Sequence, residues 1–249
     1  MNFAYKSDVG EVRPNNEDYV GVFKNIANIS FAIVADGLGG HKGGDVASEM
    51  AVSHLGFRFE ETEIDTIDVA AKWLVDEVQR ENKLILERSN QYEDLNGMGT
   101  TIVCAIFFGD EVLLANIGDS RGYLLRDSDL MQLTEDHSLV NELLKSGQIS
   151  SEEARNHPQK NIVTRTLGIS ENANIDEKII KMEENDILLL CSDGLTNMVD
   201  DQSIKTVLLN NESFADKCDK LIDMANKAGG NDNVTLLLAS SSFERRDEQ

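Results

Sequence analysis

Three short apolar segments in the middle of the chain give the first indication of its fold. Residues 100–125 read TTIVCAIFFGDEVLLANIGDSRGYLL. The apolar segments are 100–108, 112–117 and 122–125. They have the length of strands, and Gly109-Asp110 and Gly118-Asp119 separate them with residues that favour turns. We therefore predict a meander of antiparallel strands.

Further apolar runs and helical periods flank this meander on both sides. The strand-like runs are 29–35, 187–191 and 234–239. The helical periods are 45–55, 67–87, 138–145 and 214–228. Ser150 and Glu153 form a capping-box pattern that opens another short helix. Because the strands cluster instead of alternating strictly with helices, we expect an α+β fold with largely antiparallel sheets, not a doubly wound parallel sheet.

The composition is that of a folded, strongly acidic protein. The chain has 249 residues, of which 45 are acidic and 23 basic, for a formal charge of −22. An apolar fraction of 41% and a charged fraction of 27% are ordinary for globular domains. Because phosphate groups would be repelled at long range, we expect neither nucleic acid nor an anionic membrane as the main partner.

The cysteine and proline content bears on location and on the number of domains. Three cysteines without a CxxC spacing argue against a disulfide scaffold and fit a reducing cytoplasm. The N-terminus lacks an apolar signal core, and no run approaches the roughly 18 apolar residues of a membrane span. With two prolines and no linker, we expect one cytoplasmic domain over residues 2–241 and a polar tail at 243–249.

Acidic residues recur where apolar runs end, each beside glycine or another small polar residue. The clusters are Asn16-Glu17-Asp18, Asp36-Gly37, Gly118-Asp119-Ser120, Ser192-Asp193-Gly194 and Asn231-Asp232-Asn233. A single Asp-Gly pair usually marks only a turn. Carboxylates gathered at strand ends repel one another unless a cation neutralises them, and Mg²⁺ and Mn²⁺ prefer oxygen ligands. The set therefore suggests a Mg²⁺ or Mn²⁺ site with enough aspartates for two ions.

Other kinds of site fit the sequence poorly. The four histidines have neither HExxH nor paired Cys/His spacing, which argues against zinc. The glycine-rich stretch 36–44 matches neither of the common phosphate-loop patterns. A cysteine-based phosphatase needs an arginine six positions after its cysteine, but Asn197 stands at that distance from Cys191.

Taken in order, six motifs resemble those of the metal-dependent PPM (PP2C-type) serine/threonine protein phosphatases, in particular the bacterial single-domain branch. The motifs are 13–18 (RPNNED), 34–41 (VADGLGGH), 97–101 (GMGTT), 116–121 (NIGDSR), 190–195 (LCSDGL) and 230–235 (GNDNVT). They span nearly the whole chain. The resemblance implies a central sandwich of two antiparallel β-sheets flanked by antiparallel helix pairs, with a flap inserted at about 135–168.

The resemblance also implies a set of metal ligands. Asp36 would bridge two Mn²⁺ or Mg²⁺ ions, and Gly37 would give one of them a backbone carbonyl. Asp193 and Asp232 would complete the coordination of the other ion.

Supporting roles follow from the same resemblance. Glu17 and Asp18 would hold waters bound to the first ion. Asp119, together with Asp193, is similar to a third and weaker metal site of the bacterial members. Arg13 resembles the arginine that holds the substrate phosphate, for which a guanidinium offers two parallel charged hydrogen bonds.

For the reaction, the resemblance implies attack on phosphorus by a hydroxide that bridges two ions, without a phosphoenzyme. The residues that carry catalysis would be Asp36, Asp193, Asp232 and Arg13. Eukaryotic members have a histidine directly after Asp-Gly as a proposed general acid, whereas this chain has Leu38 there. Two sources of the proton stay open, His41 acting through water or a metal-bound water.

The resemblance implies phosphoserine and phosphothreonine proteins as substrates, a cognate bacterial serine/threonine kinase that the enzyme opposes, and a monomeric enzyme. In the flap, Arg155, Lys160 and Arg165 are candidate substrate contacts. The alternative is a catalytically inactive PPM-fold protein that binds partners. Such a protein should have lost one of the three core aspartates, and all three are present.

Overall fold

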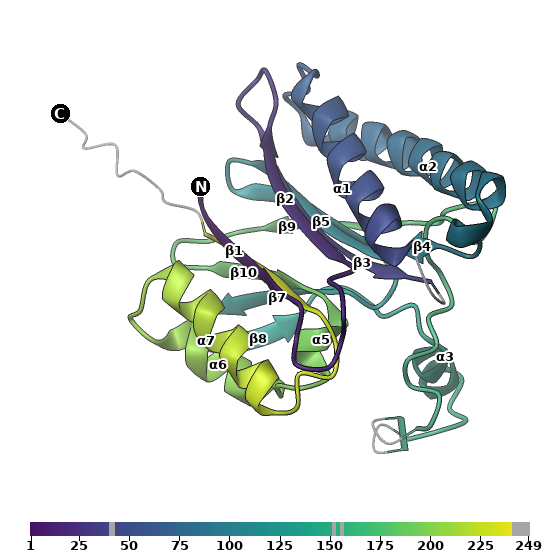
Figure 1. The fold of residues 1–249 in the computed structure, drawn as a ribbon. Helices are drawn as coiled ribbons and strands as arrows, with labels where there is room; N and C mark the ends of the chain where they lie inside the picture. The colour runs from purple at the N-terminus through teal and green to yellow at the C-terminus, as the bar shows by residue number, and fades with distance from the viewer. Residues whose placement is uncertain (40–42, 151–152, 155–156, 241–249) are drawn as a thin grey trace.

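Two antiparallel β-sheets packed face to face form the centre of the structure, and helices cover both outer faces (Figure 1). The structure is a computed structural model and describes residues 1–39, 43–150, 153–154 and 157–240. The predicted tail at 243–249 and the candidate residues His41 and Arg155 lie outside the described residues. The layered α+β fold expected from the sequence is confirmed.

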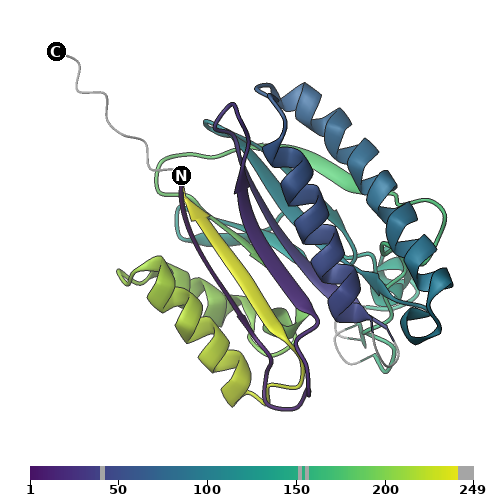
Figure 2. The same cartoon turned by 45° about the horizontal axis from the view of Figure 1, so that its top comes forward.

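The first sheet joins strands from the two ends of the chain. Its order is β1 (Asn2–Asp8), β11 (Val234–Ser240), β10 (Ile187–Cys191), β7 (Arg121–Arg126) and β8 (Asp129–Gln132). Every neighbouring pair is antiparallel. In Figure 2 the purple strand β1 lies beside the yellow strand β11, although the two stand at opposite ends of the sequence. Long-range pairing therefore completes this sheet.

The second sheet contains the apolar strands nearest the predicted site. Its order is β2 (Asp18–Lys24), β3 (Ser30–Leu38), β5 (Ile102–Phe108), β6 (Glu111–Ile117) and β9 (Asp176–Lys181), with β4 (Gly99–Thr100) paired to the end of β3. All these pairs are antiparallel. The register of β2 and β3 places Asp18 opposite Asp36.

The helices lie on the outer faces of the sandwich. On the second sheet lie α1 (Gly44–Glu60) and α2 (Ile67–Gln91), and on the first lie α6 (Asp201–Leu209) and α7 (Phe214–Lys227) (Figure 1). Among the described residues, the shorter helices include η1 (Glu93–Leu95), α3 (Leu139–Lys145) and α5 (Asp193–Thr196). Over the residues that the structure describes, no helix combines the length and apolar character needed to cross a membrane.

Strand β3 shows why its sequence is apolar without interruption. Phe31 and Ile33 pack in the core beneath α1 and α2, whereas Ala32 and Val34 pack between the two sheets. Successive side chains of a strand point to opposite faces, so a strand buried on both faces needs apolar residues at every position.

The predicted meander was wrong in its last strand. β5 and β6 pair as expected, but β7 lies in the other sheet between β10 and β8. The chain crosses between the sheets at Gly118, whose φ is +109° and whose added Cβ would lie 2.5 Å from side-chain atoms of Thr101. Glycine permits this backbone conformation and this close approach, and a turn motif alone does not tell a crossing from a hairpin.

Four strands that the sequence did not predict are the outer strands of the two sheets, namely β1, β8, β2 and β9. Most of their residues are exposed or only partly buried. Because an edge strand carries many polar side chains, it lacks the apolar run that identifies a central strand.

The segment predicted as a flap extends from the sandwich and carries α3 (Figure 1). Its two sides meet at a bridge between Ser138 and Val163, and the Leu139 N–H donates to the Ile162 carbonyl at 2.9 Å. The Ser138 side chain also caps α3 by accepting from the Asn141 N–H.

Packing between the sheets predicts the effect of truncating Leu237, which is fully buried in the inter-sheet layer. Leu237→Ala should lower the free energy of unfolding by about 2–5 kcal/mol in urea denaturation, because a cavity remains where the side chain was. Leu209→Ala is the matched control, since Leu209 is 44% exposed, and it should cost less than about 1 kcal/mol. Equal losses would contradict the layered core.

Candidate active site

Strand ends from both sheets bring acidic side chains to one cavity of about 220 Å³. Its charged lining residues are Arg13, Glu17, Asp36, Asp119, Asp193 and Asp232. Asp36 stands near the end of β3, Asp119 follows β6, and Asp193 follows β10. Asp18 begins β2 beside Asp36 and is buried. The fold therefore gathers residues that are far apart in the sequence.

The buried carboxyl groups of Asp18, Asp36, Asp119 and Asp193 have raised pKa values, chiefly because they are buried. Burial, and then the charges of Asp18 and Asp193, raise the pKa of Asp36 well above its ordinary value. Burial and nearby carboxylates raise the pKa of Asp18 to about 7 and that of Asp119 to about 7. The pKa of Asp193 rises to about 6, again through burial and the charge of Asp232. At neutral pH the group needs protons or cations to offset its charge.

The backbone around Asp36 is held by hydrogen bonds from both neighbouring strands. Its N–H donates to Thr101 Oγ1 at 3.1 Å, and its carbonyl accepts from Thr100 Oγ1 at 2.9 Å. The next residue, Gly37, donates its N–H to the Glu17 carbonyl at 3.0 Å. A Cβ on Gly37 would lie 2.0 Å from the Gly44 carbonyl oxygen, so this close approach requires glycine.

Asp18, which lies opposite Asp36 on β2, has one carboxylate oxygen in a hydrogen bond and one without a partner among the described residues. Its Oδ2 accepts from Ser192 Oγ at 2.7 Å. Its Oδ1 is buried without a hydrogen-bond partner among the described residues. A buried carboxylate oxygen without a partner is costly, so this atom fits a site where a cation or its waters bind.

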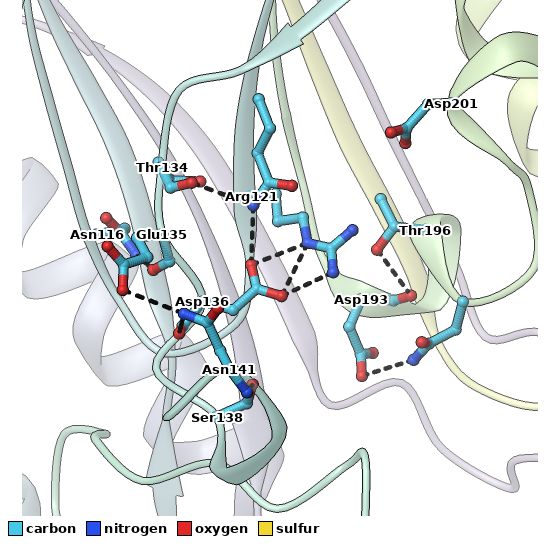
Figure 3. Close-up of polar contacts among 12 residues, drawn as sticks. Asn116, Arg121, Thr134, Glu135, Asp136, Ser138, Asn141, Asp193, Thr196 and Asp201 are labelled. Carbon is cyan, nitrogen blue, oxygen red and sulfur yellow. Dashed lines mark hydrogen bonds and ion pairs between the residues drawn. The ribbon is translucent and has the colours of Figure 1, made fainter. Parts of the chain in front are cut away.

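Two of the cavity carboxylates are paired with donors of the protein. Arg13 Nη2 lies 2.9 Å from Asp232 Oδ2, and this arginine side chain is 47% exposed. Asn197 Nδ2 donates to Asp193 Oδ2 at 2.9 Å. Figure 3 shows Asp193 on one side of the neighbouring larger cavity, with Arg121 and Asp136 hydrogen-bonded to each other on the other side.

The arrangement fits hard divalent cations that keep waters, but not a complete protein cage. Within the described part of the chain, no three His, Cys, Asp or Glu side chains are close enough together to hold one ion. Mg²⁺ typically binds through one or two carboxylates and several waters, and Mn²⁺ takes the same oxygen ligands. Mutual repulsion and the unpartnered Asp18 oxygen both favour such ions here.

Most of the residues singled out in the sequence meet at this cavity. Gly37 and Leu38 line it with the charged residues given above, but His41 lies outside the described residues. Lys160 lines the larger cavity instead, and Arg165 binds Asp176 at 3.2 Å. Whether Lys160 and Arg165 contact substrate stays a prediction.

Sequence reasoning did not find the residues that hold the carboxylates in place. Besides Thr101 and Ser192, they include Asn233, whose Oδ1 accepts from the Glu17 N–H at 2.8 Å. Arg121 also escaped notice, although Asp136 binds its guanidinium through both oxygens. Each of these residues stands within or beside a quoted motif, but only spatial contacts reveal its partner.

Comparison with known proteins gives one family. The model of the family described as Protein phosphatase 2C matches residues 12–239. The chain is 47% identical to the serine/threonine phosphatase stp of Listeria welshimeri over 247 residues, 99% of this chain and 98% of that protein. It is 43% identical to the protein phosphatase PhpP of Streptococcus pneumoniae over 244 residues, 98% of this chain and 99% of that protein.

Solved structures give the same result. The serine/threonine phosphatase of S. agalactiae matches with a TM-score of 0.92 and 42% identity, over 95% of this chain and 98% of that one. The catalytic domain of the serine threonine protein phosphatase PstP, solved in complex with two manganese ions, matches with a TM-score of 0.83 and 35% identity, over 95% and 96% of the chains.

The raised pKa of Asp119 predicts how pH affects the metal-free protein. Folding raises this pKa from 3.8 to about 7, so the folded protein keeps a proton that the unfolded chain releases. The free energy of unfolding therefore falls as pH rises between those values. Asp119→Asn lacks the titrating group. Its free energy of unfolding should therefore equal that of the wild type near about pH 4 and exceed it by about 1–3 kcal/mol near about pH 8.

Urea denaturation with a chelator present measures this difference. Asp65→Asn changes an exposed aspartate and is the matched control. An Asp119→Asn difference that stays constant with pH would mean that Asp119 titrates normally in the folded protein.

Proposed function

This chain belongs to the protein phosphatase 2C family, and from that premise we propose that its acidic cavity hydrolyses phosphoserine and phosphothreonine monoesters of proteins. The chain is a serine/threonine protein phosphatase, a hydrolase, by its similarity to stp and PhpP over nearly its whole length. One observation supports the proposal above all: buried carboxylates that repel one another line a single cavity between strand ends of the two sheets.

We assign the ions of the site to particular oxygens. Asp36 and the Gly37 carbonyl would hold one Mn²⁺ or Mg²⁺ ion. Asp36 and Asp193 would hold a second, and Asp232 would join them after it leaves Arg13 and moves closer. Asp119 with Asp193 would hold a third. Ions held there would lower the pKa of a water towards neutrality and would offset the negative charge of the phosphoryl oxygens. Glu17 and Asp18 accept hydrogen bonds from waters, and the unpartnered Oδ1 of Asp18 is suited to that role.

Arg13 binds the phosphoryl group of the substrate. It is half exposed at the cavity and bonded to Asp232, so its guanidinium can exchange that carboxylate for phosphoryl oxygens. The planar fork of arginine suits a pair of such oxygens, and it orients the phosphorus towards the carboxylate cavity. Release of Asp232 from Arg13 frees an oxygen for a cation.

The reaction needs no nucleophile from the protein. Cys191 is fully buried, and burial raises its pKa to about 12, so it does not supply a thiolate at neutral pH. Water attacks phosphorus, the bond to the serine or threonine oxygen breaks, and that oxygen takes up a proton. Two donors remain candidates for that proton: His41 through water, or a water of the cavity.

The larger cavity, of about 880 Å³, provides space for the protein chain that carries the phosphate. It shares the lining residues Asp119 and Asp193 with the smaller cavity, and residues of α5 and α6 line one side of it (Figure 3). On the other side lie residues of the segment 135–161, which includes Lys160. We propose that 135–168 is the flap of a single domain over residues 2–241.

The biological setting follows from the bacterial relatives. We propose a monomeric cytoplasmic enzyme that reverses the action of a cognate serine/threonine kinase. The alternative of a catalytically inactive binding protein is not favoured, because Asp36, Asp193 and Asp232 all line the cavity.

Metal removal gives the first test of the mechanism. With Mn²⁺, the purified protein should release phosphate from phosphoserine and phosphothreonine peptides, and EDTA should abolish this release. Adding Mn²⁺ back in excess of EDTA should restore the rate, which separates metal loss from unfolding. Activity that survives exhaustive chelation would refute a metal-dependent site.

Removal of single ligands gives the second test. Asp193→Asn and Asp232→Asn should each lower kcat by roughly 10²-fold or more, because each removes a charged ligand that supports the attacking water. Both variants should keep the wild-type circular dichroism spectrum. Asp65→Asn, an exposed aspartate away from the cavity, serves as the control. Wild-type rates in either ligand variant would reject the assigned oxygens.

A further inference from the structure

His137 is a buried histidine that the proposed reaction does not use. It is 4% exposed and lies where the segment 138–163 leaves the sandwich. Its N–H donates to the Gly118 carbonyl at 2.9 Å, and its carbonyl accepts from the Thr164 N–H at 2.8 Å. The backbone of His137 therefore joins the turn that carries Asp119 to the base of the predicted flap.

The His137 ring also bonds to this turn. Nδ1 lies 3.1 Å from the Gly118 amide nitrogen, and Nε2 lies 3.0 Å from Asp176 Oδ2 on β9. Since a backbone N–H can only donate, Nδ1 must be an acceptor without a proton. The ring hydrogen is therefore on Nε2 and is donated to Asp176.

Asp176 and Arg165 complete the surroundings of the ring. Arg165 Nη1 lies 3.2 Å from Asp176 Oδ1 and 3.4 Å from His137 Nε2. Because Nε2 carries a hydrogen and cannot act as an acceptor, Arg165 donates its hydrogen bond to the Asp176 carboxylate and not to the ring. The carboxylate of Asp176 thus receives hydrogen bonds from both groups and selects one tautomer of the histidine.

The far side of the turn is held by a second set of contacts. Ser120 Oγ and Thr101 Oγ1 share a hydrogen bond at 2.7 Å, and Thr101 Oγ1 accepts from the Asp36 N–H. Gly118 lies against Thr101 so closely that no Cβ fits. Asp119 is therefore held between His137 on one side and Thr101 with Ser120 on the other.

We propose that His137, kept by Asp176 in the tautomer with hydrogen on Nε2, is a positioning residue for the Asp119 carboxylate. It supplies the acceptor for the buried Gly118 N–H, and without that acceptor the turn must open or leave an N–H unpaired. Its effect on catalysis rests on the proposed function of the cavity. The same contacts couple the placement of Asp119 to the base of the flap.

Two substitutions separate the two ring contacts. In His137→Asn, the side-chain oxygen takes the place of Nδ1 and can still accept from the Gly118 N–H. In His137→Gln, the longer side chain reaches towards Asp176 but offers no acceptor at the place of Nδ1. A role that depends only on filling space would make the smaller asparagine the worse variant. Positioning through Gly118 makes glutamine the worse one.

The experiment measures amide hydrogen exchange at Gly118 and phosphopeptide hydrolysis in both variants. His137→Gln should speed exchange at Gly118 and lower kcat/KM, each by about 10-fold, whereas His137→Asn should stay within about 3-fold of wild type. The matched control is His157→Gln, because the His157 ring bonds within the flap segment to the Gln159 N–H. That control should leave exchange at Gly118 unchanged.

Two further readouts tie the effect to Asp119 and to the tautomer. In the double variant His137→Gln/Asp119→Asn, kcat/KM should be little lower than in Asp119→Asn alone, because both substitutions act on the same carboxylate. Nitrogen NMR shifts of the wild-type ring should show a proton on Nε2 and none on Nδ1 near neutral pH.

Several results would overturn the proposal. They are a proton on Nδ1, equal behaviour of the two variants, or fully additive losses with Asp119→Asn. If His137→Gln does not fold, the proposal is still tested by the nitrogen shifts of the wild-type ring and by the exchange rate at Gly118 in His137→Asn. Exchange and NMR need no activity, so an inactive protein with the expected shifts and rates would count against the proposed function alone.

Discussion

The mutual repulsion of buried carboxylates at and beside the small cavity governs both the stability and the chemistry of this protein. Asp18, Asp36, Asp119 and Asp193 all have raised pKa values because they are buried near one another. A fold that gathers them loses stability as they ionise, unless cations offset the charge. The same arrangement that costs stability in the absence of cations favours the binding of hard divalent ions.

A rigid scaffold is needed to keep such groups together. The two sheets share an apolar layer, and β3 is buried on both faces up to Ala35, the residue before Asp36. Small polar side chains then hold the strand ends, with Thr101 bonded to the Asp36 backbone and Ser192 bonded to Asp18. The apolar core supplies the stability, and the hydrogen bonds supply the placement.

The surroundings of the cavity divide into a fixed side and a side formed by the inserted segment. Asp36 and Asp193 belong to strands and a helix of the sandwich, whereas the larger cavity beside them is completed by residues of 135–161. His137 stands where these two parts join and bonds to both. A contact of this kind links the position of the inserted segment to the geometry of the carboxylates.

Local sequence patterns determined the central strands, the long helices, the acidic residues and the resemblance to a phosphatase family, because apolar periodicity and motif residues are local properties. The edge strands β1, β2, β8 and β9 escaped prediction because their exposed faces dilute the apolar pattern. The three-dimensional arrangement alone shows that β6 and β7 lie in different sheets, that Arg13 pairs with Asp232, and that His137 bonds to Gly118. Each of those facts depends on which distant residues come into contact, and a local sequence pattern does not specify the partner of a strand or side chain.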